Sequence, residues 1–138
     1  MRAMRVWAAL AVATSVGGCS TSIGVDLTGL WIADSYEYSN ATGAAVDIVA
    51  RDGAQMTLTI DRFIDARRRV TARFVDGNGV EQILSGEVFV DQRYMEIEGD
   101  RFDFDRTDDV LTMINPSETF DFGSGPEAAT LTIRLMQR

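Results

Sequence analysis

The chain has 138 residues, 46% of them hydrophobic, and it carries 13 basic against 21 acidic residues, a net charge of −8. This length suits one domain with a real core, and the ordinary apolar fraction argues against disorder. Phosphate backbones repel a chain this acidic, so we expect no nucleic-acid partner.

Two residue types that carry most site chemistry are scarce. The chain has no histidine and one cysteine, Cys19. This excludes Ser-His-Asp and Cys-His catalysis and argues against zinc, copper and haem sites. The clustered Asp103, Asp105, Asp108 and Asp109 fit no calcium-loop spacing, and scattered acids form carboxylate pairs by chance. We therefore expect a non-catalytic protein without a metal or cofactor.

The N-terminal segment has the order of a secretory signal. Arg2 and Arg5 form a short positive region, and an apolar stretch over residues 6–16 leads into small residues. As a helix this stretch is too short to cross a hydrocarbon core of roughly 30 Å. We therefore expect an exported protein with a cleaved leader rather than a transmembrane anchor.

The leader ends in Val16-Gly17-Gly18-Cys19, which resembles the bacterial lipobox. The resemblance implies diacylglycerol transfer to the Cys19 thiol, cleavage before Cys19 and acylation of the new amino group, for example with palmitate. Ser20, where a retention signal would have Asp, then implies the outer membrane, facing the periplasm of a double-membraned bacterium. The division expected is a signal peptide at 1–18, a flexible lipidated tether at 19–26 and one domain at 27–138. The alternative is an ordinary signal peptide with an incidental cysteine.

From Leu27 onward, apolar and polar residues alternate with a period of two, the pattern of strands with one buried face. Turn signals separate the strands, above all Asp76-Gly77-Asn78-Gly79, and Asn115-Pro116-Ser117 is expected to end one. A piece near Asp47–Ala50 is either strand or one helical turn. The pattern predicts strands at 29–38, 54–61, 68–75, 80–90, 93–98, 101–106, 109–114 and 128–136.

Most connections between these strands are too short for parallel crossovers, so neighbours in sequence should pair antiparallel. An open meander leaves two sheet edges exposed, whereas closure removes both. We therefore predict an all-β fold, an antiparallel up-and-down eight-stranded barrel.

The strand pattern is similar to that of small bacterial lipocalin-like domains of the calycin type. The motifs that carry the resemblance are Gly29-x-Trp31 at the head of the first strand, Thr57-Leu58-Thr59-Ile60, and Leu111-Thr112-Met113. The resemblance covers residues 27–138. It implies that Trp31 plugs the narrow end of the barrel and that Arg134, or Arg138, packs on its ring.

Large apolar residues at inward positions, including Ile83, are the candidates for lining a ligand site. An eight-stranded barrel is just wide enough to be filled by such side chains or to hold one small ligand. The candidate ligand-lining residues are Leu58, Ile60, Phe74, Val88, Met95, Ile97, Phe102, Phe104, Leu111, Met113, Leu131 and Ile133.

Two interpretations of function stay open. One is a lipid-anchored envelope protein whose non-catalytic barrel binds a small apolar ligand. The other is a solid barrel that serves as a structural or interaction module and docks a protein partner. On that interpretation, Tyr36, Tyr38, Phe89 and Tyr94 are the aromatic residues of the outer face.

Overall fold

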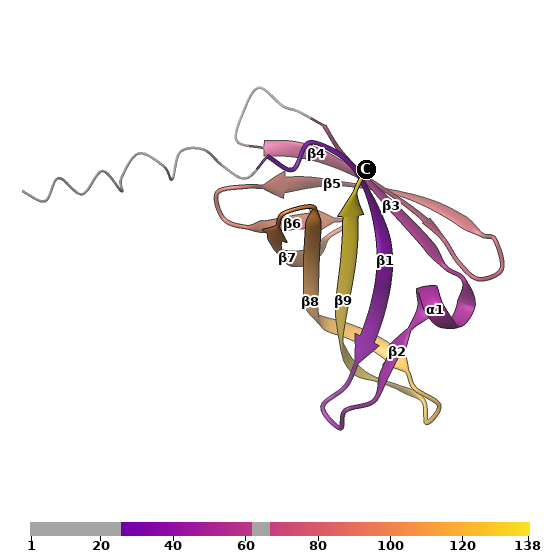
Figure 1. Ribbon diagram of the computed structural model, residues 1–138. Coiled ribbons are helices and arrows are strands. Elements are labelled where there is room, and N and C mark those ends of the chain that lie inside the picture. The colour runs from indigo at the N-terminus through magenta and orange to yellow at the C-terminus, as the bar shows by residue number, and fades with distance from the viewer. Residues whose placement is uncertain (1–25, 62–66) are drawn as a thin grey trace, which may run out of the picture.

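The computed structural model describes residues 26–61 and 67–138, which form a closed antiparallel barrel (Figure 1). Nine strands of this described part make one sheet, in the order β2-β1-β3-β4-β5-β6-β7-β8-β9. Pairing between β1 and β9 closes eight of them into a barrel, and β2 pairs with β1 alone. The predicted up-and-down barrel is confirmed. The expected leader, Cys19 and the tether up to residue 25 lie outside the described residues.

The strands follow the predicted alternation closely, with two exceptions in length. The barrel strands are β1 (Gly29–Ser39), β3 (Gln55–Asp61), β4 (Arg67–Val75), β5 (Glu81–Phe89), β6 (Tyr94–Ile97), β7 (Asp100–Thr107), β8 (Val110–Asp121) and β9 (Pro126–Gln137). β8 runs well past its expected end, and β9 begins earlier than expected. These two strands form a long hairpin that projects with the end of β1 from one end of the barrel (Figure 1).

Between β1 and β3 the chain forms the short strand β2 (Ala45–Asp47) and then the helix α1 (Ile48–Asp52). The piece that the sequence left open is therefore both strand and helical turn. The Asp47 carboxylate accepts hydrogen bonds from the backbone N–H groups of Val49 and Tyr36, each at 3.0 Å. Asp47 thus caps the helix and fixes it to β1. Gly53, in the left-handed conformation at φ 72°, ends the helix.

α1 has five residues, and none of its residues is buried. Across the described ranges 26–61 and 67–138, no helix is long and apolar enough to span a membrane.

A β-bulge in β1 changes which side chains face the barrel interior. The register with β9 shifts between Ala33 and Ser35, leaving Asp34 as the extra residue. Trp31 and Ala33 point inward before the bulge, and Tyr36 and Tyr38 take the inward positions after it. The bulge therefore turns both tyrosines into the barrel.

A second bulge explains why β8 does not end where the sequence predicted. The register with β9 shifts between Asn115 and Glu118. Asn115 pairs with Leu131 and Glu118 pairs with Ala129, so β8 has one residue more than β9 between these two pairs. The buried Asn115 side chain accepts from the Ser117 backbone N–H at 3.0 Å and donates to Glu118 Oε1 at 2.8 Å. Pro116 is tolerated in a bulge, where a strand does not need its N–H. The prediction that residues 115–117 end the strand is therefore wrong.

The half of the barrel near the start of β1 is filled by large side chains. Leu58, Val88, Met95, Leu111 and Met113 have no exposed surface. Burial of apolar surface contributes about 25 cal/mol per Å² to stability, so this packing stabilises the barrel together with its strand pairing.

Trp31 lies at the centre of this closed end. Its ring is fully buried, and its indole N–H donates to the Leu27 carbonyl at 2.9 Å. The guanidinium carbon of Arg106 lies 5.2 Å from the centre of the indole. Arg106 also donates to Gln137 Oε1 at 3.0 Å and to the Asp108 carbonyl at 2.8 Å. A further bond to the Asp26 carbonyl ties the first described residue to the same arginine.

Arg134, expected on the indole, lies elsewhere. Its guanidinium forms an ion pair with Asp34 at 3.1 Å, and both side chains are largely exposed. Arg134 pairs with Ser35 and Thr112 in the sheet, on the outward face. Alternation along β9 aims Ile133 and Leu135 inward instead. The cation on Trp31 comes from β7, a strand that the resemblance did not point to.

Replacing Trp31 with alanine should therefore destabilise the barrel strongly. Loss of a fully buried indole and its hydrogen bond should lower the free energy of unfolding by ~3–5 kcal/mol. Denaturant titration followed by circular dichroism measures the change.

Arginine variants provide the comparison. Arg106→Ala should cost ~1–3 kcal/mol because it leaves several carbonyl groups without their donor. Arg134→Ala removes one exposed ion pair and should cost less than about 1 kcal/mol. Equal effects of the two arginine variants would contradict the assignment of Arg106 to the closed end.

Candidate functional site

The opposite half of the barrel contains a cavity of about 270 Å³ that opens to solvent. Its walls come from the second halves of β1, β4 and β8, the first halves of β3 and β5, and the middle of β9. The end of β6, the start of β7 and the turn between them complete the lining. Its lining residues are Tyr36, Tyr38, Met56, Ala72, Phe74, Gln82, Leu84, Ile97, Glu98, Asp100, Phe102, Glu118 and Ile133. The barrel is thus filled at the Trp31 end and hollow at the other.

One wall of the cavity is aromatic. The ring centres of Tyr36 and Phe74 are 5.5 Å apart, and those of Tyr36 and Tyr38 are 5.7 Å apart. Tyr38 stacks on Phe120 with 4.3 Å between ring centres, and Phe120 meets Phe122 edge to face at 4.9 Å. The rings support one another at distances that favour aromatic pairs. They therefore form a continuous ribbon from β4 across β1 to the β8–β9 hairpin.

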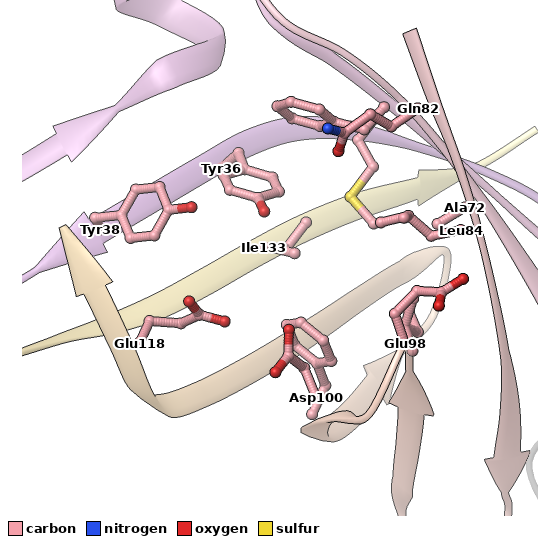
Figure 2. Close-up of a pocket in the computed structure, with 13 residues that line it drawn as sticks. Tyr36, Tyr38, Ala72, Gln82, Leu84, Glu98, Asp100, Glu118 and Ile133 are labelled. Atoms are coloured by element: carbon pink, nitrogen blue, oxygen red, sulfur yellow. The ribbon is translucent and has the colours of Figure 1, made fainter.

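The facing wall carries carboxylates. Figure 2 shows Glu118, Asp100 and Glu98 along one side of the cavity, with the rings of Tyr36 and Tyr38 along the other. Glu118 is half-buried, whereas Asp100 and Glu98 are exposed at the rim. In the part of the chain that the structure describes, no group of three or more His, Cys, Asp or Glu residues is placed to hold a metal ion.

Two of these carboxylates, Glu98 and Glu118, have polar but uncharged hydrogen-bond partners. Glu98 accepts from the Ser85 backbone N–H at 3.0 Å, and Glu118 accepts from the Asn115 amide at 2.8 Å. Among the arginines whose side chains the structure describes, none forms an ion pair with Glu98, Asp100 or Glu118. This side of the cavity and its rim therefore carry negative charge.

Burial and this negative charge both act on the ionisable groups. Burial, followed by the neighbouring Asp100 charge, raises the pKa of Glu118, and the Asn115 hydrogen bond opposes the rise. Burial is also the main cause that raises the pKa of Tyr36, with Tyr38, Glu118 and Asp100 adding to it. The pKa of Tyr38 is raised too, first by burial. Both tyrosines are therefore neutral hydroxyl groups near neutral pH.

The structure divides the predicted ligand-lining residues into two sets. Phe74, Ile97, Phe102 and Ile133 line the cavity. The other predicted residues belong to the packed core and do not line the cavity: Leu58, Ile60, Val88, Met95, Phe104, Leu111, Met113 and Leu131. Ile83, expected inside, is 56% exposed because alternation along β5 turns Gln82 and Leu84 inward.

Sequence reasoning missed most of the residues that give the cavity its chemistry. Tyr36 and Tyr38 were expected on the outer face, which is wrong because the Asp34 bulge turns them inward. Glu118 lies beyond the expected end of its strand. Pro116 was the one residue in the sequence that could have indicated the β8 bulge, since a proline within a strand pattern also marks a bulge.

Phe89 and Tyr94 remain on the outer face, alternating with the buried Val88 and Met95. Their rings stack at 4.7 Å, and the Arg101 guanidinium covers the Tyr94 ring at 4.1 Å. This outer cluster is separate from the cavity.

No protein-family model matches the chain, and comparisons with curated proteins and with solved structures find no match either.

The raised pKa of Glu118 predicts a pH-dependent effect of Glu118→Gln. A carboxyl group whose folded-state pKa is raised stabilises the fold most below its unfolded-state pKa, and that stability is lost as pH rises through the folded value. Glutamine, which keeps an acceptor for Asn115, should therefore stabilise the protein near pH 7 and not near pH 4. Because Glu118 stays partly exposed, the gain should be less than about 1 kcal/mol.

Unfolding curves of wild type and variant across this pH range measure the effect. Glu96→Gln on the outward face of β6 is the matched control, since it removes one negative charge from the same acidic protein. The groups that face Glu118 are Tyr36 and Tyr38 from β1 and Asp100 from β7. A gain that is the same for both variants would show that net charge, and not the cavity, causes it.

Proposed function

We propose that the protein is a lipid-anchored envelope protein whose lipocalin-like barrel binds one small ligand in its open-end cavity. The lipobox-like Val16-Gly17-Gly18-Cys19 supports lipidation at Cys19, and Ser20 supports the outer membrane. The ligand-binding part is supported above all by the contrast between the two halves of the barrel. A solid structural module would be filled at both ends, but the aromatic half leaves about 270 Å³ open.

The first residues of the barrel domain support this arrangement. Asp26 and Leu27 contact the closed end through Arg106 and Trp31. The tether between Cys19 and Asp26 spans at most about 25 Å when fully extended. On this proposal the filled end of the barrel faces the bilayer, and the cavity opens toward the aqueous compartment. A ligand would then reach the site without crossing the membrane surface.

The anchor can be tested by Cys19→Ala. The wild-type chain should fractionate with membranes and incorporate labelled palmitate, because acyl chains on Cys19 would be buried in the bilayer. Cys19→Ala should lose the label and move to the soluble fraction. Cys19→Ser is a second variant with the same expectation, and membrane retention of both variants would rule out the lipid anchor.

Ligand binding can be tested by native mass spectrometry of the full chain purified from its own host in a non-ionic detergent. Wild type should retain a small molecule at one copy per chain. Leu84→Trp should abolish retention, because Leu84 lines the cavity and the larger side chain fills it.

Ile83→Trp is the matched control, because the adjacent residue points outward and is 56% exposed. It should retain the ligand. An empty wild-type protein, or equal retention by both tryptophan variants, would contradict binding in the cavity.

A further inference from the structure

The cavity has two walls of opposite character, and they point to the charge of its ligand. We propose that the site takes a small amphiphilic cation, an organic ammonium group attached to an aromatic or short apolar body. This inference rests on the proposed function, since it assumes that the cavity binds a ligand. It goes further by assigning the ammonium group to the carboxylate wall and the apolar body to the ring wall.

The carboxylate wall carries uncompensated negative charge. Glu118, Asp100 and Glu98 come from three different places in the chain: the bulge of β8, the start of β7 and the preceding turn. Glu118 accepts from the neutral Asn115 amide and the Thr119 backbone, and Glu98 accepts from the Ser85 backbone N–H. A cation would supply the missing counter-charge in a partly desolvated place, where the attraction is stronger than in water. An anionic ligand would meet repulsion there.

The aromatic wall fits the same class of ligand. Tyr36, Tyr38 and Phe74 present ring surfaces, and ring faces attract ammonium groups as well as apolar groups. The tyrosine hydroxyls are neutral near pH 7, and burial raises their pKa further, so they accept or donate hydrogen bonds without adding charge. Tyr36 lies between the other two rings of this wall. A ligand against it therefore touches the aromatic ribbon while its charged end reaches Glu118.

Two alternatives fit less well. A divalent metal ion is disfavoured because the described carboxylates are not grouped to coordinate one. A long lipid chain is disfavoured by size, since about 270 Å³ lies just below the usual range for drug-sized ligands, roughly 300–1,000 Å³. The volume suits one aromatic ring with a short side arm. The net charge of −8 would also attract a cation toward the protein from a distance.

The test compares three probes of nearly equal shape and different charge: 2-phenylethylammonium, 2-phenylethanol and phenylacetate. Isothermal titration calorimetry of the full chain in a non-ionic detergent at pH 7.5 gives the affinities. The cation should bind about tenfold or more tightly than the neutral alcohol, and the anion should bind most weakly. The preference for the cation should fall as salt is raised, because the rim is exposed.

Variants test which carboxylates cause the preference for the cation over the alcohol. Glu118→Gln should reduce the cation-to-alcohol affinity ratio toward one without weakening the alcohol, and Asp100→Asn at the exposed rim should reduce it partly. Glu96→Gln on the outer face should leave the ratio unchanged. Equal binding of cation and alcohol, or a ratio that survives Glu118→Gln, would overturn the cationic ligand but leave cavity binding intact. If no probe binds wild type and native mass spectrometry finds it empty, the proposed function itself fails.

Discussion

The antiparallel ladder between β1 and β9 is the constraint on which the rest of the structure depends. It joins the first and last strands of the barrel, so no long edge remains and the eight strands share one interior. Eight strands set a diameter that large side chains just fill. Any hollow must therefore arise where the wall itself departs from regular alternation. The two departures, at Asp34 and after Asn115, occur in the two strands that flank β9.

The division of the barrel into a filled and a hollow half follows from what those bulges place inside. In the closed half, regular alternation aims leucine, methionine and tryptophan at the axis, where they pack without exposed surface. In the open half, the bulges place Tyr36, Tyr38 and Glu118 on the inner wall. The tyrosines support one another and Phe74 along the wall, and the carboxylate favours the wet side of the cavity. The small side chain of Ala72 leaves further room.

Much of the fold was predictable because alternation and turn chemistry are local properties. Leu58 and Ile60, or Leu131 and Ile133, identify their inward faces from a few neighbours, and Asp76-Gly77-Asn78-Gly79 predicts its hairpin without knowledge of the rest. A bulge depends on the partner strand, so Asp34 looks like any outward residue in the sequence. Pro116 was read as a strand end although the pairing resumes at Glu118. Tyr36, Tyr38 and Glu118 were missed for that reason, while Phe74, Ile97, Phe102 and Ile133 were found.

The bulges also affect how such a barrel can change through evolution. Pairing with β9 is intact on both sides of each bulge, so the extra residue is tolerated without altering strand number or order. Loss or gain of one codon at such a point exchanges the inward and outward side chains of everything beyond it. The mouth of the barrel can thus acquire a new set of lining residues in a single insertion or deletion. The closed half, where Trp31 and Arg106 hold the core, stays unchanged.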